Sequence, residues 1–367
     1  MSVIDAVSAT AAGLVVAING SETELSWRWV RDHGEDQESF DPTTKQRRVY
    51  AINPESPQPA MRAELSVIDG TPIVCIIWPE SPEKTWISQS TITDLLDPRP
   101  PSARACWHRP QETAVTKGNV SDVLTSDAAL SAWVADIADF GFGVLGGFQG
   151  GHNEVTALAR RIGYPQSTIF GTTWDLASDI DAHDDTAYTQ TFLAPHTDGT
   201  YAHEAPGLQM FCCTERSGTG GESVIVDGFA IAETLRTEHA EDFEVLTSVS
   251  VPGHYIEPGV ELRTSRPAIR LDDHGNIVQI SMNNYDRSPM HLPSGDMDAF
   301  YRAYGQLHEF ANDRSRWMSI RLEPGDVLIN DNWRVLHGRE AYTGGRRFVG
   351  CYLNHSDLES RMRTLGV

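Results

Sequence analysis

Two stretches give the strongest indication of what this chain folds into: PHTDGTY (195–201) and DNWRVLHGRE (331–340). The first contains His196 and Asp198, separated by one residue, and the second contains His337. Two imidazoles and one carboxylate can hold one face of a metal ion and leave the other face open, which is the ligand set of non-haem Fe(II) oxygenases. We therefore predict that the fold brings these three side chains together around Fe(II).

The pattern His-x-Asp alone is weak evidence, because a chain with 13 histidines can contain it by chance. A zinc hydrolase site or a set of structural histidines would use the same residue types. The stretches around the three residues are much longer than the bare pattern, and they favour the oxygenase interpretation.

Four of these longer stretches resemble the γ-butyrobetaine/trimethyllysine dioxygenase family of the taurine dioxygenase-like superfamily, and the trimethyllysine branch is the more similar. They are HTDGTYAHEAPGLQMF (196–211), GTGGESVIVDGF (218–229), NNYDR (283–287) and DNWRVLHGREAYTGGRRFVGCYL (331–353). The resemblance implies Fe(II) as the cofactor and 2-oxoglutarate and O₂ as co-substrates. The implied reaction hydroxylates a small acid bearing a trimethylammonium group and releases succinate and CO₂.

Arg346 is the residue that we expect to bind the far carboxylate of 2-oxoglutarate, since a planar guanidinium can donate two parallel hydrogen bonds to a carboxylate. Arg347 is the competing candidate. In an extended strand Arg346 shares a face with Tyr352, whose position matches a substrate-site tyrosine of the family, whereas Arg347 points the other way. Ser223 is a further candidate contact for 2-oxoglutarate, and a surface serine is an equally good interpretation of it.

A quaternary ammonium group has no N–H, so aromatic faces recognise it through cation–π attraction. The family surrounds this group with four aromatic side chains, and the resemblance places them at Phe170, Trp174, Tyr188 and Tyr352. Phe170 departs from the pattern, because a tyrosine often stands there. For each of these residues, packing in the core is the alternative interpretation.

The resemblance also implies contacts to the opposite end of the substrate, from Asp185, Asn283, Tyr201 and Arg287. Asp185 begins the trimethyllysine-like motif DTAY, where a carboxylate suits an α-ammonium group; a helix cap or turn is the alternative. Asn283 and Arg287 suit a carboxylate or a phosphonate equally well. Trimethyllysine, γ-butyrobetaine and a trimethylammonio-alkylphosphonate are therefore all candidate substrates.

Two other functions compete with this one. A taurine-type dioxygenase of another small sulfonate or carboxylate would keep Arg346 and the iron ligands but would need no aromatic cage. A non-catalytic binding protein on a barrel scaffold would need neither, and the intact set of His196, Asp198, His337 and Arg346 argues against it.

The composition is that of an ordinary globular protein, with 40% hydrophobic and 22% charged residues in a chain of 367. A net charge of −22 argues against nucleic acid as a partner, because phosphates would be repelled. No apolar run approaches the roughly 18 residues that span a bilayer, and the N-terminus lacks the basic start of a signal peptide. We expect a cytoplasmic protein with reduced cysteines and no membrane partner, and the family implies a homodimer.

The pattern of apolar segments predicts two domains joined by a linker. Residues 1–95 read as a small β-rich N-terminal domain, with strand-like segments at 14–18, 24–30, 63–68 and 71–78. Residues 96–115 are rich in proline and form the predicted linker. Residues 116–367 alternate short apolar strands with helical segments at 121–141, 152–163, 227–249 and 296–315. We predict a mainly β fold with flanking helices, in which the catalytic domain is a double-stranded β-helix, or jelly roll.

The front domain echoes the N-terminal domain of the same family in WRWVRDHG (27–34). In many relatives this domain binds zinc through cysteines and a histidine. Here the stretch 33–40 has no cysteine, and His33 is the only histidine before the linker. We therefore expect no structural zinc, because its ligands cannot be assembled from these parts.

Overall fold

The computed structural model describes residues 3–48, 58–79, 84–96, 106–179 and 186–367. The chain divides into two compact units, Met1–Ala103 and Arg104–Val367. Residues 97–105 of the predicted linker lie outside the described residues. None of the described helices is long and apolar enough to cross a membrane.

The first unit contains two antiparallel sheets of three strands each. Their strands are β1 (Ile4–Ala9), β2 (Gly13–Ile18) and β3 (Ser21–Ser26) in one sheet, and β6 (Arg62–Ile68), β7 (Thr71–Ile77) and β8 (Lys84–Ser88) in the other. The unit also holds helices α1 (Trp27–Asp32) and α2 (Gln89–Leu96) and the short pair β4 (Phe40–Asp41) and β5 (Gln46–Arg47). Its core includes Leu14, Val30 and Ile76.

The predicted strand 24–30 is wrong in its second half. Strand β3 ends at Ser26, whose hydroxyl accepts a hydrogen bond from the Trp29 amide at 3.2 Å and so caps a helix. Trp27 and Val30, three residues apart, are then buried on one helical face. The strand-like composition at 27–30 is therefore outweighed by a local capping contact and a helical burial pattern.

The second unit is built on two sheets. The larger has the order β11 (Trp174–Ala177), β22 (Arg346–Leu353), β13 (Leu208–Arg216), β20 (Val327–Asp331), β10 (Phe142–Gly146) and β9 (Lys117–Asn119). The smaller has the order β12 (Leu193–His196), β21 (Val335–Arg339), β14 (Ser223–Asp227) and β19 (Met318–Ile320). One apolar cluster contains side chains from both, including Phe348 and Leu328 of the first and Ile225 and Val335 of the second. Two sheets packed on a shared core confirm the predicted jelly roll.

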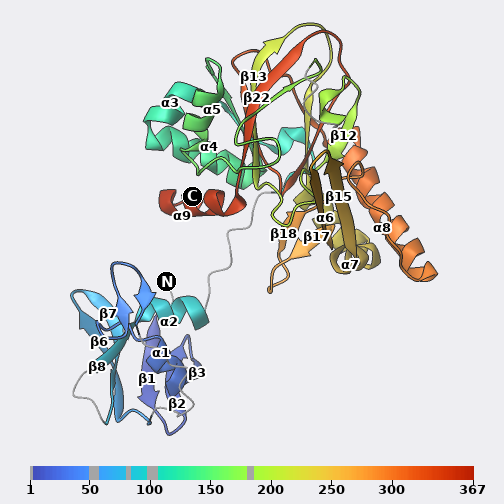
Figure 1. Cartoon of the computed structure of the whole chain (residues 1–367). Helices are drawn as coiled ribbons and strands as arrows, with labels where there is room; N and C mark the ends of the chain where they lie inside the picture. The colour runs from blue at the N-terminus through green and yellow to red at the C-terminus, as the bar shows by residue number, and fades with distance from the viewer. Residues whose placement is uncertain (1–2, 49–57, 80–83, 97–105, 180–185) are drawn as a thin grey trace. The chain divides into compact units, whose positions relative to one another are not determined.

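Helices cover the outer faces of both sheets (Figure 1). On the larger sheet these are α3 (Val120–Thr125), α4 (Asp127–Phe140), α5 (His152–Ala159) and α9 (His355–Leu365). On the smaller sheet they are α6 (Gly228–Glu238), α7 (Ala240–Ser248) and α8 (Ser294–Asn312). The helices predicted at 152–163, 227–249 and 296–315 are thus present with shifted ends, whereas the helix predicted at 121–141 is divided into α3 and α4 at Ser126, which caps α4.

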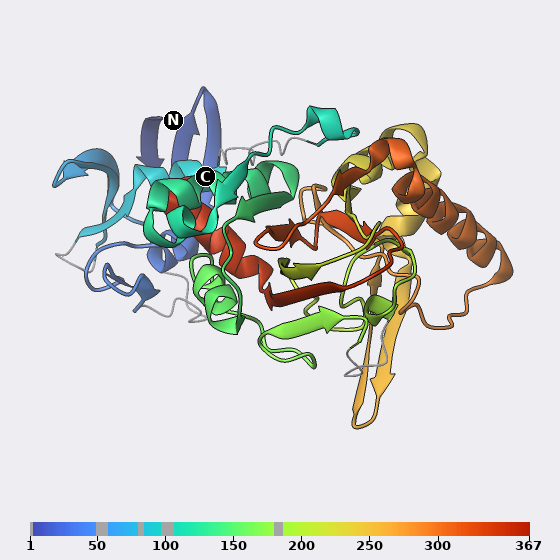
Figure 2. The same ribbon diagram turned by 90° about the horizontal axis from the view of Figure 1, so that it is seen from above.

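Strand alternation separates the helix-covered face from the inner face of each sheet. Val224 and Val226 of β14 pack against the α6–α8 helices, whereas Ile225 points into the cluster between the sheets. Two hairpins complete the unit, β15 (Ser250–Glu257) with β16 (Val260–Pro267) and β17 (Ile269–Leu271) with β18 (Ile277–Ile280). The first extends away from the sheets in Figure 2.

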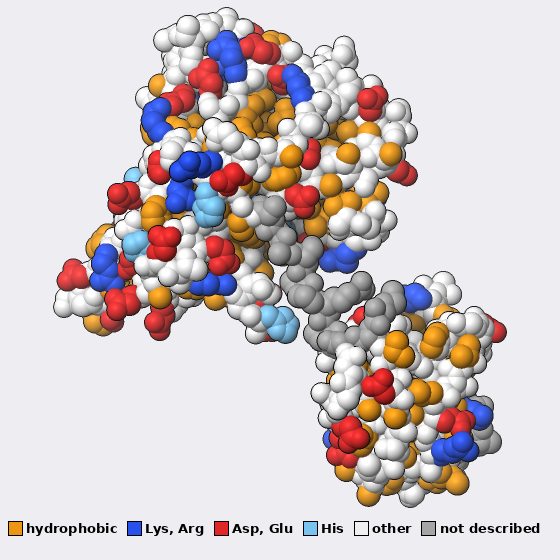
Figure 3. All heavy atoms as spheres, turned by 180° about the vertical axis from the view of Figure 1, so that it is seen from behind, with side chains coloured by type: hydrophobic (Ala, Val, Ile, Leu, Met, Phe, Trp, Pro, Cys, Tyr) orange, Lys and Arg blue, Asp and Glu red, His pale blue; other side chains and the backbone are white. Residues whose placement is uncertain are grey.

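Acidic, basic and apolar side chains are interspersed on the face of the molecule shown in Figure 3. Lysine and arginine side chains on this face lie among acidic ones and do not form a continuous stripe. The absence of nucleic acid as a partner, expected from the net charge of −22, stays a prediction.

Candidate active site

Strands β12 and β21 place the two histidines next to each other. His196 and His337 are register partners in this antiparallel pair, and their ring centroids lie 4.5 Å apart. Asp198 follows β12 by two residues, and its Oδ1 lies 3.4 Å from His196 Nε2 and 3.6 Å from His337 Nε2. One possible ligand atom from each residue lies within 4.8 Å of the others. The predicted convergence of these three residues is confirmed.

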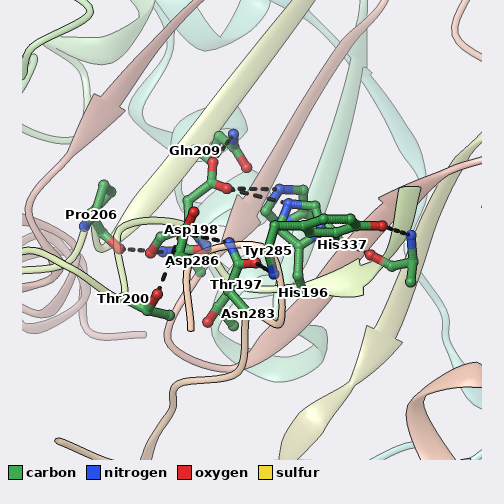
Figure 4. A network of polar contacts seen from close by, with 12 residues as sticks. His196, Thr197, Asp198, Thr200, Pro206, Gln209, Asn283, Tyr285, Asp286 and His337 are labelled. Carbon is green, nitrogen blue, oxygen red and sulfur yellow. Dashed lines mark hydrogen bonds and ion pairs between the residues drawn. The ribbon is translucent and has the colours of Figure 1, made fainter. Parts of the chain in front are cut away.

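The hydrogen bonds around these residues orient their donor atoms towards one point. The His196 Nδ1–H donates to the Ala194 carbonyl at 2.8 Å, which leaves Nε2 with its lone pair facing the site. Asp198 Oδ2 accepts hydrogen bonds from Gln209 Nε2 at 2.6 Å and from the Tyr352 hydroxyl at 2.8 Å. Oδ1 therefore faces the two imidazoles (Figure 4). This donor set fits Fe(II), which accepts imidazole and carboxylate ligands.

The surroundings of the site favour an ionised Asp198 and a neutral His337, which are the protonation states of metal ligands, but they raise the pKa of His196. Burial lowers the pKa of His337 to about 4, although Asp198 opposes this effect. Burial would raise the pKa of Asp198, but the His337 and His196 charges hold it well below its usual range. Burial would also lower the pKa of His196, yet its hydrogen bond to Asp198 raises it overall. At neutral pH the site thus contains a carboxylate and at least one neutral imidazole.

The backbone at Asp198 is fixed by Asn332, which lies between β20 and β21. The Asp198 amide donates to Asn332 Oδ1 at 2.8 Å, and Asn332 Nδ2 donates to the carbonyls of Asp198 at 3.0 Å and Pro206 at 2.8 Å. Asn332 and Gln209 were missed by the sequence reasoning. Both lie in stretches that carry the family resemblance, but only the fold shows that they contact Asp198.

A cavity of about 1010 Å³, part of which is open to solvent, lies beside the three ligands. Most of the site residues predicted from the sequence line this cavity. Its lining includes His196, Asp198, His337, Arg346, Ser223, Phe170, Trp174, Tyr188, Tyr352, Asn283 and Tyr201.

Arg346 is buried in the cavity wall with 8% of its surface exposed, and its Nε makes no hydrogen bond within the described part of the chain. Its guanidinium lies 4.1 Å from the Phe348 ring centroid and 5.7 Å from that of Tyr342. Burial and the nearby charge of Arg339 lower the pKa of Arg346 to about 9. Arg347 is more exposed and pairs with Asp179 at 2.8 Å. The buried guanidinium at position 346 is thus the better placed of the two to meet an anion in the cavity.

Among the predicted substrate residues that the structure describes, Arg287 does not line the cavity. The Arg287 guanidinium lies over the rings of Tyr301 and Tyr304 in α8, at 5.9 and 5.6 Å, and its Nε donates to Asn284 Oδ1 at 3.2 Å. Asp185 lies outside the described residues. Conversely, the cavity is also lined by residues that were not predicted from the sequence, among them Tyr285, Asp286, Phe211 and Arg339. Tyr285 and Asp286 belong to NNYDR and Arg339 to HGRE, so the quoted motifs were the available signal.

Known proteins that are similar in sequence to this chain are dioxygenases, as the metal-ligand geometry indicates. Residues 107–352 match the family described as "Taurine catabolism dioxygenase TauD, TfdA family". A trimethyllysine dioxygenase of Meyerozyma guilliermondii is 31% identical, over 95% of this chain and 92% of its own length. The gamma-butyrobetaine dioxygenase of Homo sapiens is 32% identical, over 71% of this chain and 69% of its own length. The mitochondrial trimethyllysine dioxygenase of Gallus gallus is 29% identical, over 92% and 82%.

Proposed function

Because this chain belongs to the TauD/TfdA family of Fe(II)- and 2-oxoglutarate-dependent dioxygenases, we propose that it hydroxylates a small acid bearing a trimethylammonium group. The bound Fe(II), 2-oxoglutarate and O₂ supply the oxidising chemistry, and succinate and CO₂ are the co-products. The protein holds the metal through His196, Asp198 and His337. Its remaining cavity residues select the substrate, orient it and exclude water.

The aromatic wall of the cavity is the observation that carries this proposal. The ring centroids of Trp174 and Tyr352 are 5.6 Å apart, and Phe170 and Tyr188 line the same cavity. These faces suit a quaternary ammonium ion, which cannot form N–H hydrogen bonds. The Tyr352 hydroxyl donates to Asp198, so one ring of this wall lies directly beside a residue that would hold the metal. A cation held there would keep the neighbouring carbon atoms within reach of the oxidising centre.

We also propose that Arg346 binds the distal carboxylate of 2-oxoglutarate. Its buried guanidinium lines the cavity together with Ser223, which can donate a hydroxyl hydrogen bond to the same co-substrate. A dianionic keto acid would offset the charges of Arg346 and Arg339, both of which are buried in the wall.

The polar part of the cavity favours trimethyllysine among the three candidate substrates. Asn283, Tyr201 and Asp286 line this part, and Asp286 Oδ2 accepts a hydrogen bond from Asn283 Nδ2 at 2.8 Å. A carboxylate beside a carboxamide suits an α-ammonium group next to a carboxylate better than a carboxylate or phosphonate alone. The homodimer and the cytoplasmic location expected from the sequence stay predictions.

Succinate formation tests the proposed function. The purified protein with Fe(II) and 2-oxoglutarate would be given trimethyllysine, γ-butyrobetaine, a trimethylammonio-alkylphosphonate or taurine. We expect substrate-dependent succinate with at least one trimethylammonium acid and none above background with taurine. Succinate formation with taurine alone would contradict the proposal and favour a sulfonate dioxygenase.

A further inference from the structure

Arg339 is a second buried arginine in the cavity wall, and its contacts differ from those of Arg346. It lies two residues after His337 on β21, so strand alternation puts both side chains on the inner face of the smaller sheet. It is 5% exposed and lines the cavity. Its NH1 and NH2 groups donate to three backbone carbonyls, those of Ala187 at 2.9 Å, Thr189 at 2.6 Å and Thr191 at 2.9 Å.

These three carbonyls belong to the segment that carries Tyr188, and two of them directly flank it. The segment is the short 3₁₀ turn η2 (Thr186–Tyr188) and the coil that leads into β12. A turn of three residues has little intrinsic stability. A planar guanidinium can hold several carbonyls at fixed positions, which makes it well suited to order such a segment.

Arg339, which binds the segment carrying Tyr188, also shares a neighbouring ring with Arg346, the residue that we propose binds 2-oxoglutarate. Its guanidinium lies 5.0 Å from the Tyr342 ring centroid, and the Arg346 guanidinium lies 5.7 Å from the same ring. Within the described part of the chain, Arg339 donates its hydrogen bonds to backbone carbonyls, and its Nε is buried without a partner there. Burying a charge is costly unless hydrogen bonds compensate it, and for Arg339 the bonds to these three carbonyls provide that compensation.

We propose that Arg339 is a positioning residue for substrate selection: it ties the segment 186–191 to the metal-bearing strand β21 and thereby fixes Tyr188 in the aromatic wall. This inference rests on the proposed function, because it assumes that Tyr188 contacts a trimethylammonium group. Arg339 acts through Tyr188 and does not itself touch the cationic group.

A double-mutant cycle tests this inference through charge selectivity. The measured quantity is the ratio of kcat/KM for the trimethylammonium substrate to kcat/KM for its neutral isostere, in which carbon replaces the quaternary nitrogen. Removing one ring of the cage by Tyr188→Leu should lower this ratio about tenfold. We expect Arg339→Gln to lower it to a similar level and the double variant to lower it no further, since both changes remove the same contact.

The matched control is Arg314→Gln, which removes an arginine from the surface. The Arg314 side chain is 70% exposed and pairs with Glu340, the residue after Arg339. We expect this variant to keep the wild-type ratio. An unchanged ratio in Arg339→Gln, or losses that multiply in the double variant, would overturn the inference. Absence of turnover with every trimethylammonium acid would instead refute the proposed function.

Amide hydrogen exchange of the peptide 186–192, measured by mass spectrometry without substrate, gives a readout that does not depend on turnover. Arg339→Gln should accelerate exchange in this peptide and leave the α8 peptide 294–312 unchanged. Arg339→Lys keeps the charge without the planar fork and should give an intermediate rate. Unchanged exchange at 186–192 would overturn the inference, as would failure of both variants to fold, which would show that Arg339 is needed for the fold itself.

Discussion

Tyr352 links the metal ligands to the aromatic wall through a single side chain. Its hydroxyl donates to Asp198 Oδ2 at 2.8 Å, while its ring lies 5.6 Å from that of Trp174. Gln209 donates to the same carboxylate oxygen at 2.6 Å. Because outer hydrogen bonds of this kind orient a ligand and tune its basicity, both residues should affect metal binding without touching the metal.

Tyr352→Phe and Gln209→Leu should each weaken Fe(II) binding by about 10- to 100-fold. Tyr352→Phe keeps the aromatic ring, so the charge selectivity for the trimethylammonium substrate should be retained while the iron requirement rises. Anaerobic Fe(II) titration of each variant provides the measurement. Wild-type iron affinity in both variants would show that these hydrogen bonds do not support Asp198.

Arg346 and Arg347 are adjacent in sequence but have different surroundings. Arg346→Ala should raise the KM for 2-oxoglutarate by about 10- to 100-fold, because charge-assisted hydrogen bonds to a carboxylate are lost. Arg347→Ala should change this KM little, since its guanidinium pairs with Asp179 near the surface. Steady-state kinetics at saturating substrate separate the two. The opposite result would move the co-substrate assignment to Arg347.

At the scale of elements, the close approach of β12 and β21 is what holds the ligands together. Gly338 lies between His337 and Arg339, and a Cβ built on it would lie 2.6 Å from the Leu193 carbonyl oxygen of β12 and 3.1 Å from the Pro195 nitrogen. Only a residue without a side chain allows the two strands to pack this closely. The spacing of the two histidines therefore depends on a residue that has no metal-binding group.

Gly338→Ala should lower the free energy of unfolding by about 1–3 kcal/mol, because the strands must separate to accommodate the methyl group. It should also weaken Fe(II) binding, since β12 carries His196 and β21 carries His337. Urea unfolding and iron titration measure the two effects. Gly295→Ala is the control, because a Cβ there meets nothing within 4 Å. Wild-type stability and iron affinity in the Gly338→Ala variant would contradict this role for the strand spacing.

Helix α9 is joined to the end of β20 by a buried histidine. His355 Nε2 lies 3.6 Å from Asp331 Oδ2, and its Nδ1 lies 3.4 Å from Glu359 Oε1. The ring stacks on Trp333 with centroids 4.4 Å apart. Burial alone would lower the pKa of His355, but the two carboxylates outweigh it and raise the pKa to about 9.

A histidine whose pKa is higher in the folded than in the unfolded protein stabilises the fold most at low pH. The contribution of His355 should be fully present below its unfolded pKa near 6.5 and should be lost as the pH rises towards about 9. The loss is on the order of 3 kcal/mol at most. Unfolding free energies of wild type and His355→Gln between pH 6 and 9.5 give the measurement. A difference between the two proteins that does not change with pH would contradict this account.

Long periodic elements were predictable from the sequence, whereas local capping and side-chain direction were not. The helices at 227–249 and 296–315 were found because their apolar spacing matches the face that they bury. The residues Trp27 to Val30 form a helix because Ser26 caps it, which outweighs their strand-like composition. Arg287 was expected at the substrate because of its motif, but its guanidinium packs over two tyrosines of α8.

The metal ligands were predictable because an Fe(II) site of this kind needs two imidazoles and a carboxylate, and because long motifs surround the three residues. Gln209, Asn332 and Arg339 act through hydrogen bonds to residues distant in sequence, and only the folded chain shows those contacts. The sequence therefore located the reaction centre better than it located the residues that support it.

At the scale of the whole molecule, the metal-binding chemistry lies in the second unit and the first unit has a core of its own. In the first unit His33 stacks on Trp29 with centroids 4.0 Å apart, and its Nδ1 lies 2.8 Å from the Trp29 carbonyl. Cys75 is buried in strand β7. Both side chains contribute to local packing, and the expectation that no structural zinc is bound stays a prediction.

The assignment of His196, Asp198 and His337 as ligands of one ferrous ion, with room left for 2-oxoglutarate, underlies the proposed function. An anaerobic titration of the full-length protein with Fe(II) in the presence of 2-oxoglutarate tests it most directly. We predict a weak visible charge-transfer band that saturates at one iron per chain and is absent from Asp198→Ala and His337→Ala. A band of wild-type strength in either variant, or no band in the wild-type protein, would contradict the account.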